Sequence, residues 1–133
     1  MITAIIIDDE ASSRNALRQK LTNHCADVLI IAECENGEEG IKNIEEKKPD
    51  IVFLDVEMPR MDGLTLVKSI RDSEPLCKLP VILHSSLSGQ ATQDAGIKVG
   101  ANGYVVKNNI RDLLELMTEL LGTRAPSQTM AAG

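Results

Sequence analysis

The sequence predicts an α/β protein built on a parallel sheet, and two patterns in the chain indicate it. Short apolar runs rich in β-branched residues alternate with segments of helical character, which is the order of βαβ units. The runs are apolar at successive positions, as expected for strands buried on both faces. We expect strands near residues 3–7, 28–33, 51–54, 81–83 and 103–106.

A helix is expected after each strand, at about 11–23, 37–47, 63–72, 89–98 and 110–121. Asp62 has the character of an N-cap for the third helix. The fourth helix is weakened by an interior glycine, Gly96, which makes motion there or firm packing equally reasonable. In the last helix, Leu116 and Leu120 exceed what a core-facing stripe needs and could mark a partner or dimer face.

Composition limits the class of protein. The chain has 133 residues with 43% hydrophobic content, which suits one domain with a core. A net charge of −6 argues against a nucleic-acid surface. Three cysteines without a C-x-x-C pair are expected to be reduced thiols of a cytosolic protein. We expect neither a signal peptide nor a membrane span, which needs ~18 apolar residues.

Residues that suit phosphoryl chemistry follow four of the apolar runs. Asp8 and Asp9 follow the first run, Asp55 the third, Ser85 the fourth and Lys107 the fifth. Because ligands bind at the carboxyl ends of the strands in open α/β sheets, we expect these five side chains to converge. Three crowded carboxylates would repel one another and raise a pKa, and a hard divalent cation such as Mg²⁺ removes that conflict.

Asp55 is the expected phosphate acceptor, because the strand before it would hold its carboxylate at the rim as a nucleophile. The phosphoryl oxygens need their charge neutralised, by the metal, by Lys107 and by a hydrogen bond from Ser85. Nothing nearby resembles a strong base for water, so the acyl phosphate should persist. Taken separately, an acidic pair after a strand also caps helices, and a lone aspartate also forms turns.

Together the motifs are similar to the receiver domain (CheY-like) of two-component response regulators, over about residues 2–121. They are Asp8-Asp9-Glu10, Asp55-x-x-Met58-Pro59-x-Met61-Asp62-Gly63, Ser85 and Gly100-Ala101-x-Gly103-Tyr104-x-x-Lys107. The resemblance implies a flavodoxin-like (βα)5 three-layer sandwich with a five-stranded parallel sheet in order 2-1-3-4-5. Residues 1–121 would be the receiver domain, and 122–133 a flexible tail, a linker stub or residues left from cloning.

The resemblance also implies a role for each site residue. Asp55 would take a phosphoryl group from a sensor histidine kinase or a histidine phosphotransfer protein and become 4-aspartylphosphate. Asp9 and Asp55 would ligate Mg²⁺ directly, with Glu57 contributing its backbone carbonyl and Asp8 acting through water. Mn²⁺ could substitute for Mg²⁺, and Lys107 would contact the phosphoryl group.

On activation, Ser85 would move toward the phosphoryl group and Tyr104 would turn inward, a shift between two packings. The fourth helix, fifth strand and last helix would form the output face, for an output protein or a missing output domain, and phosphorylation could favour a dimer. The chain would be no enzyme beyond its own phosphorylation and slow dephosphorylation. We expect it in the cytoplasm, with no nucleic acid or membrane bound.

Some positions depart from the family pattern. Asn108 stands where proline usually follows the lysine, so we expect a trans Lys107–Asn108 bond and a shifted loop, since a cis non-proline bond costs about 2.5–4 kcal/mol. Ser86 stands where alanine is common. For His84 a hydrogen-bonded structural role is favoured, with a pH-sensing or relay role as the alternative.

Glu57 and Leu87 occupy the positions that tune phosphate lifetime, and we expect slow autodephosphorylation from them. Residues 83–89 resemble receivers in some chemotaxis adaptor proteins, whereas the first half resembles those of transcription regulators, so the output stays open. Two other functions also stay open: a pseudo-receiver that binds without phosphorylation, and an aspartate-nucleophile phosphohydrolase. P-loop and dinucleotide-binding motifs are absent from the sequence.

Overall fold

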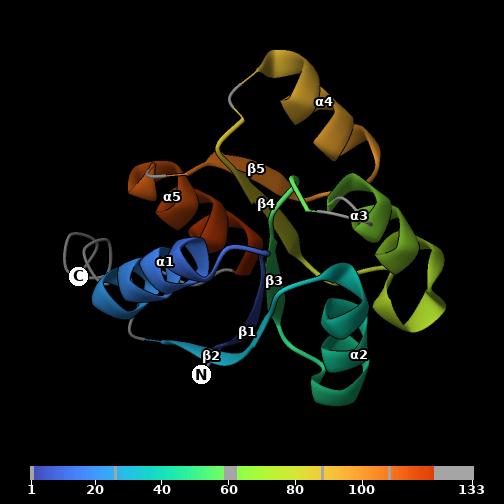
Figure 1. Ribbon diagram of the computed structural model, residues 1–133, viewed down its shortest axis with the longest axis horizontal. Helices are drawn as coiled ribbons and strands as arrows, with labels where there is room; N and C mark the ends of the chain where they lie inside the picture. The colour runs from blue at the N-terminus through green and yellow to red at the C-terminus, as the bar shows by residue number, and fades with distance from the viewer. Residues whose placement is uncertain (1, 26, 59–62, 88, 108, 122–133) are drawn as a thin grey trace.

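The computed structural model describes residues 2–25, 27–58, 63–87, 89–107 and 109–121, and shows alternating strands and helices (Figure 1). All strand pairs are parallel, and the sheet order is β2-β1-β3-β4-β5. The expected fold class is therefore confirmed. The elements are β1 (Ile2–Ile7), α1 (Ala11–His24), β2 (Val28–Cys34), α2 (Gly37–Lys47), β3 (Ile51–Leu54), α3 (Gly63–Asp72), a 3₁₀ turn η1 (Glu74–Leu76), β4 (Val81–Ser85), α4 (Gln90–Lys98), β5 (Gly103–Val106) and α5 (Ile110–Leu121).

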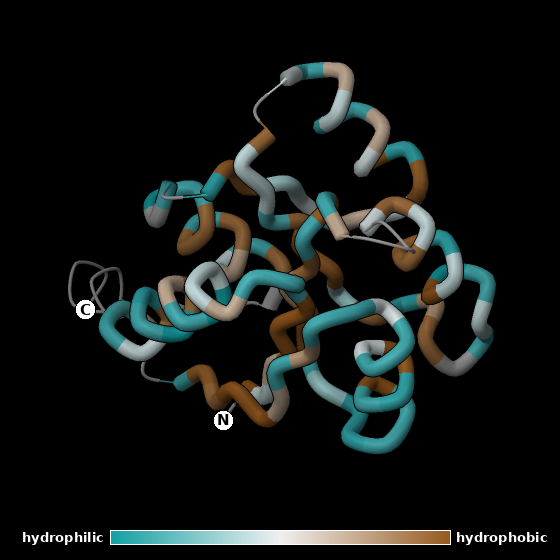
Figure 2. Tube along the Cα trace, viewed as in Figure 1, coloured by the Kyte–Doolittle hydropathy of each residue, from teal (hydrophilic) through white to brown (hydrophobic). Residues whose placement is uncertain are grey.

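The sheet separates two hydrophobic clusters, which makes the protein a three-layer sandwich (Figure 1). On one face, Leu17 of α1 and Met117 of α5 pack with Phe53, which is fully buried. On the other face, Ile44 of α2 and Leu66 of α3 pack against alternate residues of the same strands. Figure 2 shows the apolar strands at the centre and polar residues along the outer helices. Because both faces are covered, the central strands are mostly apolar, and β3 is apolar at every position.

The helix ends follow local chemistry. The side chain of Asn36 accepts a 2.9 Å hydrogen bond from the Glu39 N–H and so caps α2. Lys48 ends α2 in the left-handed region, with φ 48°, and Pro49 follows. Several expectations lie outside the described residues: the Asp62 cap and its loop, the Lys107–Asn108 bond, and residues 122–133.

The fourth helix packs closely on the sheet in spite of its glycine. A Cβ added at Gly96 would lie 2.5 Å from Leu83 Cδ1, so the glycine lets α4 approach β4. Leu116 covers Gly103 of β5, and both Leu116 and Leu120 are half-buried against the cluster of α1 and α5. Packing within the domain therefore accounts for part of the apolar surface of these two leucines, and a partner face there stays a prediction.

Cys25, Cys34 and Cys77 are free, and the first two are buried. In the part of the chain that the structure describes, no helix combines the length and apolar character needed to cross a membrane.

Candidate functional site

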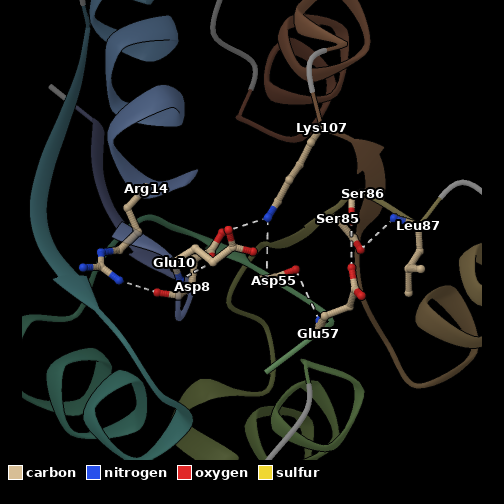
Figure 3. Close-up of polar contacts among 9 residues, drawn as sticks. All are labelled: Asp8, Glu10, Arg14, Asp55, Glu57, Ser85, Ser86, Leu87 and Lys107. Carbon is tan, nitrogen blue, oxygen red and sulfur yellow. Dashed lines mark hydrogen bonds and ion pairs between the residues drawn. The ribbon is translucent and has the colours of Figure 1, made fainter. Parts of the chain in front are cut away.

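Hydrogen bonds between neighbouring strands align their carboxyl ends at one edge of the sheet. The Asp55 N–H donates to the Ile7 carbonyl (2.9 Å), and the Lys107 N–H donates to the Ser85 carbonyl (2.7 Å). Asp8 follows β1 directly. Figure 3 shows the side chains of Asp8, Asp55 and Lys107 directed toward one another across the strand ends.

Three carboxylates gather at this edge. Each of Asp8, Asp9 and Asp55 offers an oxygen that lies within 4.8 Å of the oxygens of the other two. Asp8 and Asp55 are only 3% and 2% exposed, whereas Asp9 is exposed to solvent. The Lys107 ammonium lies 3.1 Å from Asp8 Oδ2 and 3.8 Å from Asp55 Oδ2. One ammonium faces three carboxylates, so the ionised cluster has an excess of negative charge.

The two buried carboxylates respond differently to this crowding. Burial, followed by the charge of Asp8, raises the pKa of Asp55 to about 7, although Lys107 opposes the shift. Burial also acts to raise the pKa of Asp8, but hydrogen bonds, including one of 2.9 Å from the Glu10 N–H, and the Lys107 ammonium outweigh it, and the pKa lies below its ordinary value. A divalent cation would relieve the repulsion on Asp55, and three carboxylates are donors that such a cation prefers.

The hydroxyl groups of Ser85 and Tyr104, the two residues expected to move on activation, both hydrogen-bond to the backbone of Leu87. Ser85 is fully buried, and its hydroxyl accepts a 3.1 Å hydrogen bond from the Leu87 N–H. The Tyr104 hydroxyl donates a 2.7 Å bond to the Leu87 carbonyl. Both contacts hold the segment after β4.

Two contacts at the site were not anticipated from the sequence. The Ser86 hydroxyl donates a 2.8 Å bond to Glu57 Oε1 and so links the loops after β3 and β4 (Figure 3). The Arg14 guanidinium donates a 2.6 Å bond to the Asp8 carbonyl and also lies 3.4 Å from Glu33 Oε1, so it ties α1 to the loop and to β2. The signal for the first was the serine at a position where alanine is common.

His84 differs from expectation. It is buried, and burial, followed by the Lys107 ammonium, lowers its pKa to about 4. The imidazole is therefore neutral near pH 7, which disfavours a pH-sensing role there. Within the described ranges no hydrogen bond involves its ring, so the expected hydrogen-bonded structural role is not what the structure shows. Its strand position was evident from sequence, but its surroundings depend on how α1 packs.

Comparisons with known proteins agree with this geometry. The family description "Response regulator receiver domain" matches residues 4–119. The chain is 37% identical over 107 residues to the chemotaxis protein CheY of Listeria monocytogenes, covering 80% of this chain and 87% of that protein. A chain in the crystal structure of the CheX–CheY–BeF3–Mg complex from Borrelia burgdorferi superimposes with a TM-score of 0.80 at 26% identity, covering 90% of this chain and 89% of that one.

Other relatives are longer proteins. A protein-glutamate methylesterase/protein-glutamine glutaminase of Methanococcoides burtonii is 32% identical over 124 residues, which cover 91% of this chain but 34% of that protein. The chain thus spans about a third of the length of the methylesterase relatives that it matches.

Proposed function

Because this chain belongs to the response regulator receiver domain family, we propose that it is a signalling switch in which Asp55 accepts a phosphoryl group. Phosphorylation-dependent switching is the general function of receiver domains in two-component systems. The donor would be a sensor histidine kinase or a histidine phosphotransfer protein. The observation that carries the proposal is the buried Asp55 carboxylate, held beside two further carboxylates and 3.8 Å from the Lys107 ammonium.

The donor set fits a magnesium ion. Asp9 and Asp55 would bind it directly, the Glu57 backbone carbonyl would be the third protein ligand, and Asp8 would act through water. When bound, the ion supplies positive charge to one phosphoryl oxygen. Mn²⁺, which accepts the same oxygen donors, would serve as a substitute.

Protein side chains would stabilise the negative charge on the other two phosphoryl oxygens. A carboxylate oxygen of Asp55 forms the new P–O bond as the P–N bond of the phosphohistidine breaks, and the imidazole leaves with the electron pair. Lys107 needs little movement to reach an oxygen on Asp55, since its ammonium already lies 3.8 Å from Oδ2. It would neutralise a second oxygen, and Ser85 would donate a hydrogen bond to the third.

The switch would act through the Leu87 backbone. For its hydroxyl to reach the phosphoryl group, Ser85 must give up the bond from the Leu87 N–H. The same residue holds the Tyr104 hydroxyl through its carbonyl, so a shift of this segment would release the ring to turn inward. Two packings of Ser85 and Tyr104, biased by the phosphoryl group, would then alter the face formed by α4, β5 and α5.

The receiver domain would end near residue 121, and the matched family region to residue 119 supports this. We further propose a cytoplasmic location, and an output protein or a separate output domain as the partner of the altered face. Phosphorylation could favour a dimer through it.

Labelling with ³²P-acetyl phosphate in Mg²⁺ tests the function. We expect stoichiometric label that is stable to acid and labile to alkali, that does not form when EDTA is present from the start, and that is absent from Asp55→Asn. The matched control is Asp72→Asn, because Asp72 is exposed at the far end of α3, and this variant should label normally.

The same measurement separates the two alternatives. Absence of label on a folded wild-type protein would leave a pseudo-receiver. Steady release of phosphate with little accumulated label would indicate a phosphohydrolase. Label that survives in Asp55→Asn would place the acceptor elsewhere and refute the proposal.

A further inference from the structure

A second polar cavity, of about 270 Å³, lies beside the acidic site. It is lined from α1 and from the ends of β4 and β5, and the three clustered carboxylates are not among its lining residues. It has room for a small ion with some water. The polar side chains that line it include Glu10, Ser13, Lys20, His84, Ser86 and Lys107.

At this cavity the Ser13 hydroxyl oxygen is buried without a hydrogen-bond partner among the described residues, and the His84 ring lies on the same lining. The Ser13 hydroxyl lies beside the Asp8 carboxylate, and its proximity helps to hold the pKa of that group low, but it is outside hydrogen-bonding geometry. His84 is 94% buried, and its neutral ring carries one N–H donor. Because buried polar groups are almost always hydrogen-bonded, the unpartnered Ser13 hydroxyl, with the His84 ring on the same cavity lining, points to a ligand with acceptor oxygens.

The charges at the cavity favour an anion. Lys107 and Lys20 line the cavity together with His84, and besides burial the charges of both lysines lower the pKa of its ring. Asp8 opposes them in part, and Glu10 is the acidic residue among the lining side chains. Glu10 makes no side-chain cap hydrogen bond to α1, and the first turn of this 14-residue helix contains no acidic residue. The N–H groups of this helix terminus add positive potential near Ser13, which the charges of Asp9 and Glu10 in front of the helix oppose.

We propose that this cavity binds a small oxyanion, with Ser13 and His84 donating hydrogen bonds and Lys20 and Lys107 supplying charge. Two sources share this chemistry: a free tetrahedral anion such as inorganic phosphate, or the carboxylate of a bound molecule. Lys107 also faces Asp8 and Asp55, so an anion here is linked through one ammonium to the charge at the acidic cluster.

NMR of the two histidines can test the site on the full chain. The sequence contains only His24 and His84, and His24 is exposed at the end of α1, so it serves as an internal reference. Inorganic phosphate is titrated at constant ionic strength against chloride, with EDTA present and no phosphodonor, so that neither metal nor phosphorylation contributes. Separate titrations use sulfate and acetate.

We expect a saturable shift of the His84 resonances while those of His24 stay constant. Lys20→Gln and Ser13→Ala should each weaken binding about tenfold, whereas Lys20→Arg should retain it. Lys42→Gln, which removes an exposed lysine of α2, is the matched control and should leave binding unchanged. Circular dichroism verifies that each variant is folded.

The titrations also decide the source of the oxyanion. Phosphate and sulfate binding more tightly than acetate would assign the site to a free tetrahedral anion, and the reverse order to a carboxylate. A shift that never saturates, that is equal at His24, or that Lys20→Gln and Ser13→Ala leave intact would overturn the proposal. Because no phosphodonor is used, this outcome is independent of whether Asp55 is phosphorylated.

Discussion

Gly63 makes the closest backbone approach to the phosphoacceptor, and replacing it tests how tightly the site is held. A Cβ at this position would overlap the Asp55 carbonyl oxygen and lie 2.8 Å from Val56 Cα. Ordinary contact begins near 3.4 Å, so the backbone would have to move by about 0.6 Å to clear Val56 Cα, and further to clear the Asp55 oxygen. The Gly63 N–H also donates to the Val56 carbonyl at 2.9 Å, which leaves the start of α3 little freedom to retreat.

Two opposing terms set the size of the effect of Gly63→Ser. Serine gains about 0.5 kcal/mol over glycine in a helix. Overpacking costs about 1–3 kcal/mol, and here the neighbour is backbone and cannot rotate away as a side chain can. We expect the free energy of unfolding to fall by about 1–2 kcal/mol. Because a displacement of about 1 Å at a reacting group can cost 10²-fold, labelling of Asp55 should slow about tenfold.

Gly89→Ser is the matched control for this prediction. A Cβ added at Gly89 would have no atom within 4 Å. Gly89 is the N-cap of α4, a position at which serine is favoured. Urea unfolding gives the free energies, and the initial rate with ³²P-acetyl phosphate gives the labelling rate. If Gly63→Ser matched Gly89→Ser in both measurements, the reasoning from close approach would be refuted.

Four further predictions concern stability, thiol chemistry and phosphate lifetime. Lys48 has a left-handed backbone conformation, which costs a non-glycine residue about 1–2 kcal/mol. Lys48→Gly should therefore raise the free energy of unfolding, measured by urea titration, by about 1 kcal/mol. The control Lys48→Ala should not raise it. Half-buried Cys77 should react with Ellman's reagent before the buried Cys25 and Cys34. Burial raises the pKa of each of these two thiols from 9.0 to about 11, so the unfolded chain loses these protons at a lower pH than the folded chain. The free energy of unfolding should therefore fall as pH rises from 9 to about 11. Replacing both cysteines with serine should remove this fall. Labelled Asp55 should decay over minutes or longer, and a half-life of seconds would contradict the inference that no residue of the site activates water.

Local patterns were sufficient for most of the elements. Residues 51–54 are apolar throughout and lie between Asp50 and Asp55, so a buried strand there needed no tertiary information. Pro49 likewise bounded α2. The convergence of Asp55 with Lys107 followed from one rule, because parallel strands end at the same edge. The strand order came instead from the family resemblance, since strands that are apolar on both faces pair equally well in several orders.

Side-chain partners were beyond the reach of the sequence. The bond from Ser86 to Glu57 joins residues 29 positions apart, and no local pattern specifies it. The sequence suggested that the His84 ring would be hydrogen-bonded within the core. In the structure the ring lines a cavity between α1 and the end of β4. Such outcomes depend on distances of a few ångströms between elements that are remote in the chain.

The sequence by itself thus determined which segments are strands and helices and which acids, hydroxyl and ammonium lie at one edge, because burial periodicity and strand ends are local properties. Tertiary structure alone decided the electrostatic character of each group. Asp8 and Asp55 are the same residue type at equivalent strand ends, yet their pKa values move in opposite directions. Burial acts on both, and the difference comes from the hydrogen bonds and charges that packing places around each carboxylate.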